Sequence, residues 1–348
     1  MFVSDQQLDN VLSLLSGREH VVITAHMSPD GDAMGSALAL QHILRENVFA
    51  GTEAPEITVV VPNRFPSFLA WIPGAEEVLV AEDAPEKIQE VFGKADLIFI
   101  LDYCELKRVG LLEPLIEASP AARVLIDHHI NPHTLTADAE ISHPEVPATA
   151  FLVTELFNRL KERGALAHDT LSADTATCLY TGLMTDTGNF AYSNANLPEL
   201  YRMVAGLIEA GIDRNSIYDS VYNQFTVDRL RFTGYCLYHK MRVFPKFHTA
   251  LIALSSEELR RFNFQSGDAE GIVNMPLQIA DVFYSVFMRE DTDKIKISFR
   301  SQGDRPVNVY ASEIFNGGGH LNAAGGDSHK TLAETVKLFE DTFRKYFR

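Results

Sequence analysis

Short apolar runs alternate with stretches of helical periodicity along the first part of the chain. The apolar runs are rich in β-branched residues and have the length of buried strands, at residues 20–24, 57–61, 77–80, 96–101 and 123–126. Between them, the spacing of apolar positions predicts helices at residues 33–45, 85–92 and 111–118. This alternation is typical of a parallel sheet with helices on both faces.

The pattern changes after residue 148. Helical periodicity follows at residues 151–159, 171–184, 197–209 and 227–239, and strands return at residues 249–254, 282–289 and 294–300. The last two strands flank a polar segment and predict a hairpin. We therefore expect an α/β protein of two domains, in which an N-terminal, doubly wound, mostly parallel sheet precedes a smaller C-terminal α/β domain. The expected domains are residues 1–197 and 233–348, joined by a helical connector at 198–232.

Length and composition agree with this organisation. The 348 residues exceed one typical domain, and a content of 46% hydrophobic and 22% charged residues is ordinary for a globular protein. No apolar run reaches the ~20 residues that span a bilayer, and the N-terminus shows no secretory signal. The three cysteines, Cys104, Cys178 and Cys236, form no CxxC pair. We expect a cytoplasmic protein that does not associate with membranes.

Charge is divided unequally along the chain. The formal net charge of -17 argues against binding to long duplex nucleic acid, because that binding requires a basic surface. Residues 230–348 nevertheless contain 16 Lys or Arg and 14 Asp or Glu, whereas residues 1–229 contain 14 and 33. This division favours a first half that binds cations and a second half that holds an anionic substrate.

Carboxylates and imidazoles follow the ends of several predicted elements. Three strands are followed by such groups, and one helix ends in a carboxylate: His26, Asp30 and Asp32; Asp102; Asp127, His128 and His129; and Asp186. The carboxyl ends of parallel strands meet at one edge of a sheet, where ligands bind. Oxygen and nitrogen donors without thiolate suit Mn²⁺ or Mg²⁺. The sequence therefore predicts a metal centre at this edge.

The donors are numerous enough for two ions. Two metals about 4 Å apart, bridged by a carboxylate, activate water and stabilise the leaving oxygen of a phosphoester. Asp102 is the expected bridge, because it stands alone at a central strand end between the other clusters. Asp127 is less suited to direct ligation and is expected to orient a neighbouring imidazole. This chemistry predicts a hydrolase.

A glycine-rich segment is a second candidate binding site. It contains Gly317, Gly318, Gly319 and His320, followed by residues 322–326 with two further glycines. Consecutive glycines allow backbone N–H groups to approach an anion closely. Arg300, at the end of a predicted strand, can reach the same phosphate with its planar fork. Taken alone, the glycines also fit a flexible loop, and the arginine also fits a solvated strand end.

These motifs resemble those of the DHH phosphoesterase superfamily. The spacing His26-x₃-Asp30-x-Asp32, the lone Asp102, the Asp127-His128-His129 triplet and Asp186 match its four motifs in order. The segment at residues 317–325 resembles the signature of the associated C-terminal domain. The resemblance covers about residues 8–346, and members of this size with that C-terminal domain resemble the nanoRNase/pAp phosphatase group. Those enzymes are Mn²⁺-dependent, trim very short oligonucleotides and remove the 3′-phosphate of adenosine 3′,5′-bisphosphate (pAp).

The resemblance also implies residue roles. One metal would be held by His26, Asp30 and Asp102, and the second by Asp32, Asp102, His128 and Asp186. His129 would contact the reacting phosphate. The C-terminal domain would hold the substrate through Arg300, Gly317, Gly318, Gly319 and His320, with the active site in the cleft between the domains.

Several alternatives stay open at this point. The same chemistry on linear or cyclic dinucleotides, such as pApA or cyclic di-AMP, is the nearest one. An exopolyphosphatase is a weaker alternative, and a non-catalytic nucleotide sensor is disfavoured because the ligand set is intact. Of the two ions, Mn²⁺ is expected, with Mg²⁺ as the alternative. A homodimer is one open state of assembly.

Overall fold

The computed structural model divides the chain into two units, Met1–Gln224 and Phe225–Arg348. It describes residues 2–51, 54–130, 135–191, 196–265 and 267–347. The division falls inside the segment predicted as a connector. Helices α7 (Leu197–Glu209) and α8 (Arg214–Tyr222) contribute buried side chains to the core of the first unit, whereas α9 (Val227–Tyr235) belongs to the second.

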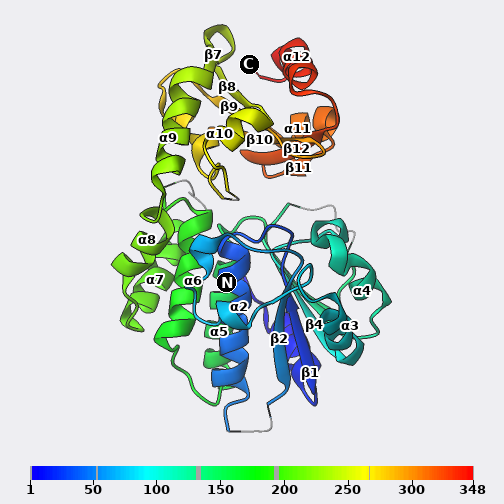
Figure 1. Ribbon diagram of the computed structural model, residues 1–348. Coiled ribbons are helices and arrows are strands. Elements are labelled where there is room, and N and C mark those ends of the chain that lie inside the picture. Colours follow the sequence, from blue (N-terminus) through cyan, green and yellow to red (C-terminus); the bar gives the residue numbers. More distant parts are fainter. Residues whose placement is uncertain (1, 52–53, 131–134, 192–195, 266, 348) are drawn as a thin grey trace. The chain divides into compact units, whose positions relative to one another are not determined.

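The N-terminal unit is built on a parallel sheet of six strands (Figure 1). The strands are β1 (His20–Thr24), β2 (Glu56–Val61), β3 (Leu79–Val80), β4 (Leu97–Leu101), β5 (Ala122–Asp127) and β6 (Ala139–Ser142). Their order is β3-β2-β1-β4-β5-β6, and every pair is parallel. The chain therefore reverses its direction of winding between β1 and β4, and ligands bind at such a switch point, at the carboxyl ends of the strands.

Helices cover both faces of this sheet. One face packs against α1 (Asp5–Leu15), α2 (Gly31–His42), α5 (Thr149–Glu162) and α6 (Ala173–Asp186), and α2 continues into a π-helical segment, η1 (Ile43–Val48). The other face packs against α3 (Pro85–Lys94), α4 (Glu113–Ala118) and the 3₁₀ segment η4 (Leu106–Leu112). Side chains alternate between the two cores along β1, β2, β4 and β5, as the pleat of a strand requires.

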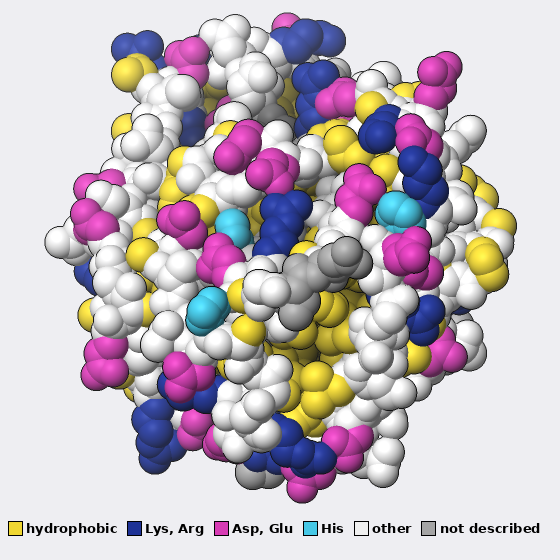
Figure 2. Space-filling model, turned by 90° about the horizontal axis from the view of Figure 1, so that it is seen from below, with side chains coloured by type: hydrophobic (Ala, Val, Ile, Leu, Met, Phe, Trp, Pro, Cys, Tyr) yellow, Lys and Arg dark blue, Asp and Glu magenta, His cyan; other side chains and the backbone are white. Residues whose placement is uncertain are grey.

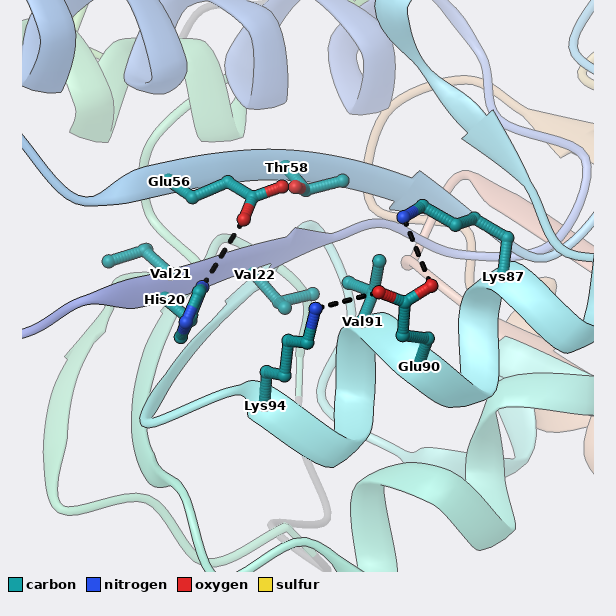
Figure 3. Close-up of a pocket in the computed structure, with 9 residues that line it drawn as sticks. All are labelled: His20, Val21, Val22, Glu56, Thr58, Lys87, Glu90, Val91 and Lys94. Carbon is teal, nitrogen blue, oxygen red and sulfur yellow. Dashed lines mark hydrogen bonds and ion pairs between the residues drawn. The ribbon is translucent and has the colours of Figure 1, made fainter.

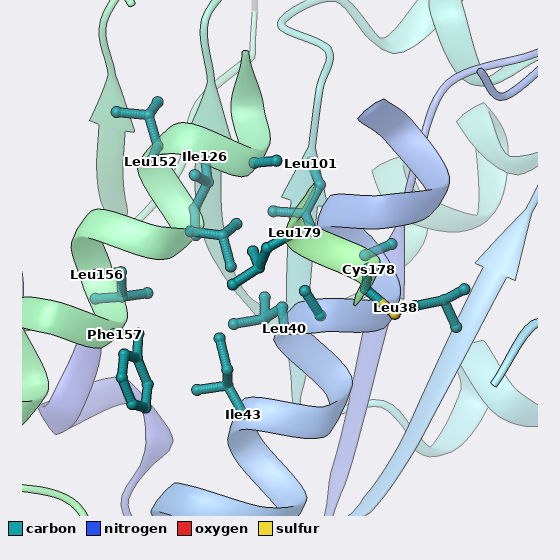
Figure 4. Close-up of a cluster of buried hydrophobic side chains, with 14 of the residues drawn as sticks. Leu38, Leu40, Ile43, Leu101, Ile126, Leu152, Leu156, Phe157, Cys178 and Leu179 are labelled. Atoms are coloured by element: carbon teal, nitrogen blue, oxygen red, sulfur yellow. The ribbon is translucent and has the colours of Figure 1, made fainter. Parts of the chain in front are cut away.

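The larger core fixes the relative positions of α2, α5 and α6. Figure 4 shows Leu40 of α2, Leu152 of α5 and Leu179 of α6 beside Leu101 and Ile126 of the sheet. All of them are buried. Each side chain of this kind contributes roughly 1.5–3 kcal/mol on burial, so the three helices are held firmly against the ends of β4 and β5.

The amino ends of the strands offer little room for a ligand. A hollow there is lined by His20, Glu56, Lys87, Glu90 and Lys94, and its volume is about 20 Å³ (Figure 3). The charges are already paired, since His20 meets Glu56 at 3.3 Å and Lys94 meets Glu90 at 2.6 Å. Such a hollow holds about one water molecule.

On the face in Figure 2, basic and acidic side chains are intermixed rather than gathered by sign.

The C-terminal unit has a mixed sheet of its own. Its strands are β7 (Arg242–Phe244), β8 (Thr249–Leu254), β9 (Tyr284–Glu290), β10 (Ile295–Ser301), β11 (Gly318–Gly319) and β12 (Ala323–Ser328), in the order β11-β12-β10-β9-β8-β7. Only β8 and β9 pair in parallel. Helices α10 (Ser256–Arg261), α11 (Asn308–Phe315) and α12 (Leu332–Thr342) complete the unit, with short segments η5 (Cys236–Lys240) and η7 (Ile272–Gln278). The α/β class with two domains is confirmed.

A polar cluster anchors α10 to α9. Glu258 closes a capping box with Ser255, accepts the hydroxyl of Tyr235 at 2.5 Å and meets the ammonium of Lys240 at 2.8 Å. Burial alone would raise the pKa of Glu258, but the hydrogen bonds from Lys240, Ser255 and Tyr235 outweigh it and hold that pKa at about 2.

None of the helices within the described ranges combines the length and apolar composition needed to cross a bilayer.

Candidate metal centre

The first donors lie in the turn between β1 and α2. The carboxylate of Asp30 caps α2, because its Oδ1 accepts the N–H groups of Asp32 and Ala33 at 3.0 Å each. Gly31 begins the helix, and a Cβ at this position would lie 2.4 Å from Oγ1 of Thr185. Glycine is therefore required for α2 to approach α6 so closely. The turn also places the side chain of His26 at the carboxyl edge of the sheet.

Asp102 follows β4 in an unusual backbone conformation. Its φ is 64°, in the left-handed region that Asp and Asn tolerate better than most residues. Its N–H donates to the carbonyl of Ile126 at 3.1 Å, and its Oδ1 accepts the hydroxyl of Thr149 at 2.8 Å. The side chain is buried. The local strain is thus compensated by hydrogen bonds that fix the direction of the carboxylate.

Asp102 is common to three groups of possible ligands in the N-terminal unit. Within each group, the donor atoms lie within 4.8 Å of one another; the groups are His26 with Asp30 and Asp102, Asp32 with Asp102 and His128, and Asp102 with Asp127 and His129. Nε2 of His26 is 3.3 Å from Oδ2 of Asp102, and Nε2 of His128 is 3.5 Å from Oδ1. Ligands on one octahedral ion with bonds of about 2.1 Å are roughly 3.0–4.2 Å apart. The spacing therefore suits two ions that share Asp102.

The second group extends to the end of α6. Nε2 of His128 lies 3.9 Å from Oδ2 of Asp32 and 3.5 Å from Oδ2 of Asp186. The six residues expected as metal ligands are thus brought together at one edge of one unit. Their sequence positions span residues 26 to 186, so the fold, rather than local spacing, assembles them.

Asp127 and His129 form a separate hydrogen-bonded pair. Nδ1 of His129 lies 2.8 Å from Oδ1 of Asp127, and the backbone N–H of His129 donates to Oδ2 at 3.2 Å. Asp127 is fully buried. An ionised carboxylate only accepts hydrogen bonds, so the proton sits on Nδ1 and the orientation of the ring is fixed.

The carboxylates of the cluster are crowded. Burial and the negative charges of Asp102, Asp186 and Asp30 raise the pKa of Asp32 well above its usual value. Burial would also raise the pKa of Asp102, but the imidazoles of His26, His129 and His128 outweigh it, and that pKa falls below its usual range. Burial lowers the pKa of His26, and the carboxylates of Asp102 and Asp30 reverse the effect and raise it. A bound cation would remove the repulsion, so the donor set fits divalent metal ions.

Two contacts of Asp32 were not foreseen from the sequence. The N–H groups of Thr149 and Ala150, at the start of α5, donate to its two carboxylate oxygens at 2.6 and 2.9 Å. The positive end of a helix stabilises a carboxylate placed there. Gly182 of α6 closes the other side, because a Cβ there would lie 2.8 Å from Oδ1 of Asp32. The predicted start of a helix near residue 148 was the available signal, but it did not reveal which carboxylate lay opposite.

The glycine-rich segment of the second unit differs from the expected loop. Gly318 and Gly319 form strand β11, and the following glycines lie in β12. A Cβ at Gly317 would lie 1.9 Å from the carbonyl oxygen of Gly325, and Gly319 has a φ of +133°. Close strand packing therefore accounts for these two glycines. Gly318 is exposed and has open space around it, so packing does not explain it.

Arg300 and His320 stand at neighbouring strand ends. Arg300 is paired with Ala323 across β10 and β12, and its Nη1 donates to the carbonyl of Phe299 at 2.9 Å. The backbone N–H of His320 donates to the carbonyl of Ala323 at 2.7 Å. The strand register thus brings the predicted arginine and histidine to the same end of this sheet.

Comparison with known proteins identifies two families in the sequence. The N-terminal domain of the DHH family matches residues 20–183, and the DHHA1 domain matches residues 247–348. An exopolyphosphatase-related protein from Bacteroides fragilis has a crystal structure similar to this one, with 41% identity, a TM-score of 0.89 and coverage of 99% of this chain and 97% of that chain.

Several curated relatives carry the name bifunctional oligoribonuclease and PAP phosphatase NrnA. The protein of Thermus thermophilus is 29% identical over 311 residues, which are 88% of this chain and 83% of the relative. The protein of Mycoplasma genitalium is 27% identical over 322 residues, 91% of this chain and 92% of the relative.

Proposed function

Because the chain belongs to the DHH family and is a phosphoesterase, we propose that it uses two divalent metal ions to hydrolyse short oligonucleotides and the 3′-phosphate of adenosine 3′,5′-bisphosphate. The ions are Mn²⁺ in the first instance, with Mg²⁺ as the alternative. The observation that carries the proposal is the position of Asp102 in three overlapping groups of ligands. The names of the NrnA relatives support the choice of substrates.

The proposal assigns a role to each of the metal-binding residues in the N-terminal unit. His26, Asp30 and Asp102 would hold one ion, and Asp32, Asp102, His128 and Asp186 would hold the other. Bound ions would supply a water of lowered pKa and positive charge at the phosphate.

The remaining polar groups orient the cluster. Thr149 directs the shared carboxylate of Asp102 through its hydroxyl, and the start of α5 holds Asp32. Asp127 accepts the hydrogen bond from Nδ1 of His129 and so fixes the orientation of the ring. When Nε2 also carries a proton, that N–H would donate to a phosphate oxygen. From the second unit, Arg300, His320 and the adjacent glycines hold the substrate in this proposal.

Short substrates suit the charge of the chain. The first 229 residues carry 33 acidic and only 14 basic residues, so a long trailing strand would be repelled at low salt. Proteins that hold long single strands use a basic groove with stacked aromatic side chains, worth roughly 1–3 kcal/mol per base. The sequence contains no long Lys/Arg-rich tract of that kind.

A substrate panel with product analysis tests the proposal. Purified protein with Mn²⁺ is assayed at matched concentrations of a dinucleotide, a 24-mer, adenosine 3′,5′-bisphosphate, a cyclic dinucleotide and polyphosphate. Faster cleavage of the dinucleotide than of the 24-mer, together with release of phosphate from adenosine 3′,5′-bisphosphate, is the expected outcome. Equal or faster cleavage of the 24-mer would contradict the limit on length.

The other substrates distinguish the alternatives. Preferred turnover of the cyclic dinucleotide would favour a dinucleotide phosphodiesterase instead. The name of the similar Bacteroides fragilis protein makes polyphosphate a necessary comparison, and preferred release of phosphate from it would favour an exopolyphosphatase.

A further inference from the structure

Arg108 lies beside the loop that carries His26. Its carbonyl oxygen accepts the N–H of Met27 at 2.7 Å, which ties the start of η4 to the turn between β1 and α2. The N–H of Arg108 donates to the carbonyl of Glu105 at 2.9 Å. The backbone of Arg108 is therefore fixed next to the metal-ligand loop at the carboxyl edge of the sheet.

The residues after Arg108 prevent this segment from moving independently. Val109 is fully buried in the core under α4. Gly110 has a φ of 46° and packs against Met27, so closely that a Cβ would lie 2.6 Å from the Met27 sulfur. The base of the Arg108 side chain is thus held in place before any ligand arrives, which lowers the entropic cost of binding.

The guanidinium of Arg108 differs from two neighbouring cationic side chains at the carboxyl edge of the sheet, Arg64 and Lys107, in having no acidic partner among the described residues. Arg64 is bound by both carboxylate oxygens of Asp83, and Lys107 is paired with Glu105. Arg108 is exposed, and among the residues that the structure describes no carboxylate or carbonyl pairs with its side chain.

We infer that Arg108 is a substrate-binding residue whose guanidinium holds the phosphate of a nucleotide at the rim of the carboxylate cluster. The inference rests on the proposed function, since it assumes a phosphate ester as the substrate. A planar fork meets two phosphate oxygens at once, which an ammonium does not do. The Asp30 carboxylate, in the loop that Arg108 contacts through its backbone, is about half exposed, and a positive charge nearby would reduce its repulsion of an incoming phosphate.

Kinetics of three variants test this assignment. Arg108→Ala removes the fork, Arg108→Lys keeps the charge alone, and Lys107→Ala removes the neighbouring charge as a matched control. We expect Arg108→Ala to raise the KM for a dinucleotide roughly 10- to 100-fold with a much smaller change in kcat, as for loss of a hydrogen bond to a charged group. Arg108→Lys should be intermediate, and Lys107→Ala should stay within about twofold of wild type.

Two further measurements separate binding from a structural role. Millimolar methylguanidinium should partly restore the KM of Arg108→Ala and leave Lys107→Ala unchanged. Metal content and the unfolding midpoint should match wild type in all three variants. Loss of metal or of stability in Arg108→Ala would overturn the assignment.

The role of Arg108 and the proposed function are contradicted by different results. An active wild-type enzyme with equal KM values for Arg108→Ala and Lys107→Ala would overturn the role of Arg108 and leave the proposed function standing. A wild-type protein that cleaves no phosphate ester in the presence of Mn²⁺ would overturn both.

Discussion

Replacing Gly182 with alanine adds one methyl group against a proposed metal ligand. The new Cβ would lie 2.8 Å from Oδ1 of Asp32 and 2.7 Å from the Cβ of Ala150, both shorter than real contacts of this kind. Asp32 has little freedom to move away, because its oxygens accept two backbone N–H groups at 2.6 and 2.9 Å. The clash must therefore displace the carboxylate or separate α6 from α5.

The magnitude follows from three effects. Overpacking costs roughly 1–3 kcal/mol, and weakening the hydrogen bonds to the Asp32 carboxylate costs about 1.5–3 kcal/mol more. Alanine returns about 1 kcal/mol through its higher helix propensity. We expect Gly182→Ala to destabilise the metal-free protein by about 1.5–5 kcal/mol, and to weaken Mn²⁺ binding at least about tenfold, which is 1.4 kcal/mol.

Gly206 provides a matched control for this substitution. It also lies inside a helix, α7, but it is exposed and has nothing within 4 Å of the added Cβ. Gly206→Ala should stabilise the protein by about 0.5–1 kcal/mol. Urea unfolding in chelator, followed by calorimetric titration with Mn²⁺, measures both variants. A Gly182→Ala protein that is as stable as Gly206→Ala and binds Mn²⁺ like wild type would refute the packing argument.

Three further predictions concern other parts of the molecule. Thr149→Val removes the hydroxyl that donates to Asp102, and should destabilise the protein by about 1–3 kcal/mol in urea unfolding while raising the Mn²⁺ concentration required for activity. Arg300→Ala and His320→Ala should raise KM with metal content unchanged, and metal loss in elemental analysis would contradict their assignment to substrate binding. Glu258 has a pKa of about 2 in the folded protein, below its usual 4.5, so its stabilising effect is present above pH ~4.5 and is lost as the pH falls towards 2. Glu258→Gln should therefore lower stability at pH 7 and flatten acid unfolding across this range, and an unchanged acid profile would show that the contacts of Glu258 contribute little.

Strand ends were the most predictable part of the site. β1, β4 and β5 are short, apolar and buried, so their sequence pattern identified them and located His26, Asp102 and the residues after Asp127. Parallel pairing then brings these ends to one edge whatever the order of strands. The class of the fold is confirmed by the sheet order, and the family resemblance is confirmed by the DHH and DHHA1 matches.

Contacts between distant segments were not predictable. Thr149 contacts Asp102, which lies 47 positions away in the sequence, and Asp32, which lies 117 positions away. No local sequence pattern identifies such partners. The glycine-rich β11 and β12 have low strand propensity, and they form strands because glycine permits the close backbone packing at Gly317 and Gly319. The helices at 197–222 were recognised as helices, but their packing against the first unit was not visible in the sequence.

The shared carboxylate is the centre of this account, and Asp102→Asn tests it with little disturbance. Asparagine tolerates the left-handed φ of 64° and keeps an oxygen for the hydroxyl of Thr149, so the fold should be preserved. It removes the negative charge that both proposed ions share.

The decisive measurement is the rate of dinucleotide hydrolysis as a function of Mn²⁺ concentration for wild type and Asp102→Asn, with unfolding midpoints recorded on the same samples. We predict that wild type requires Mn²⁺ and that the variant stays below about a tenth of wild-type turnover at every concentration, with an intact fold. A folded Asp102→Asn protein that retains more than that, or a wild-type rate that does not depend on a divalent ion, would contradict this prediction.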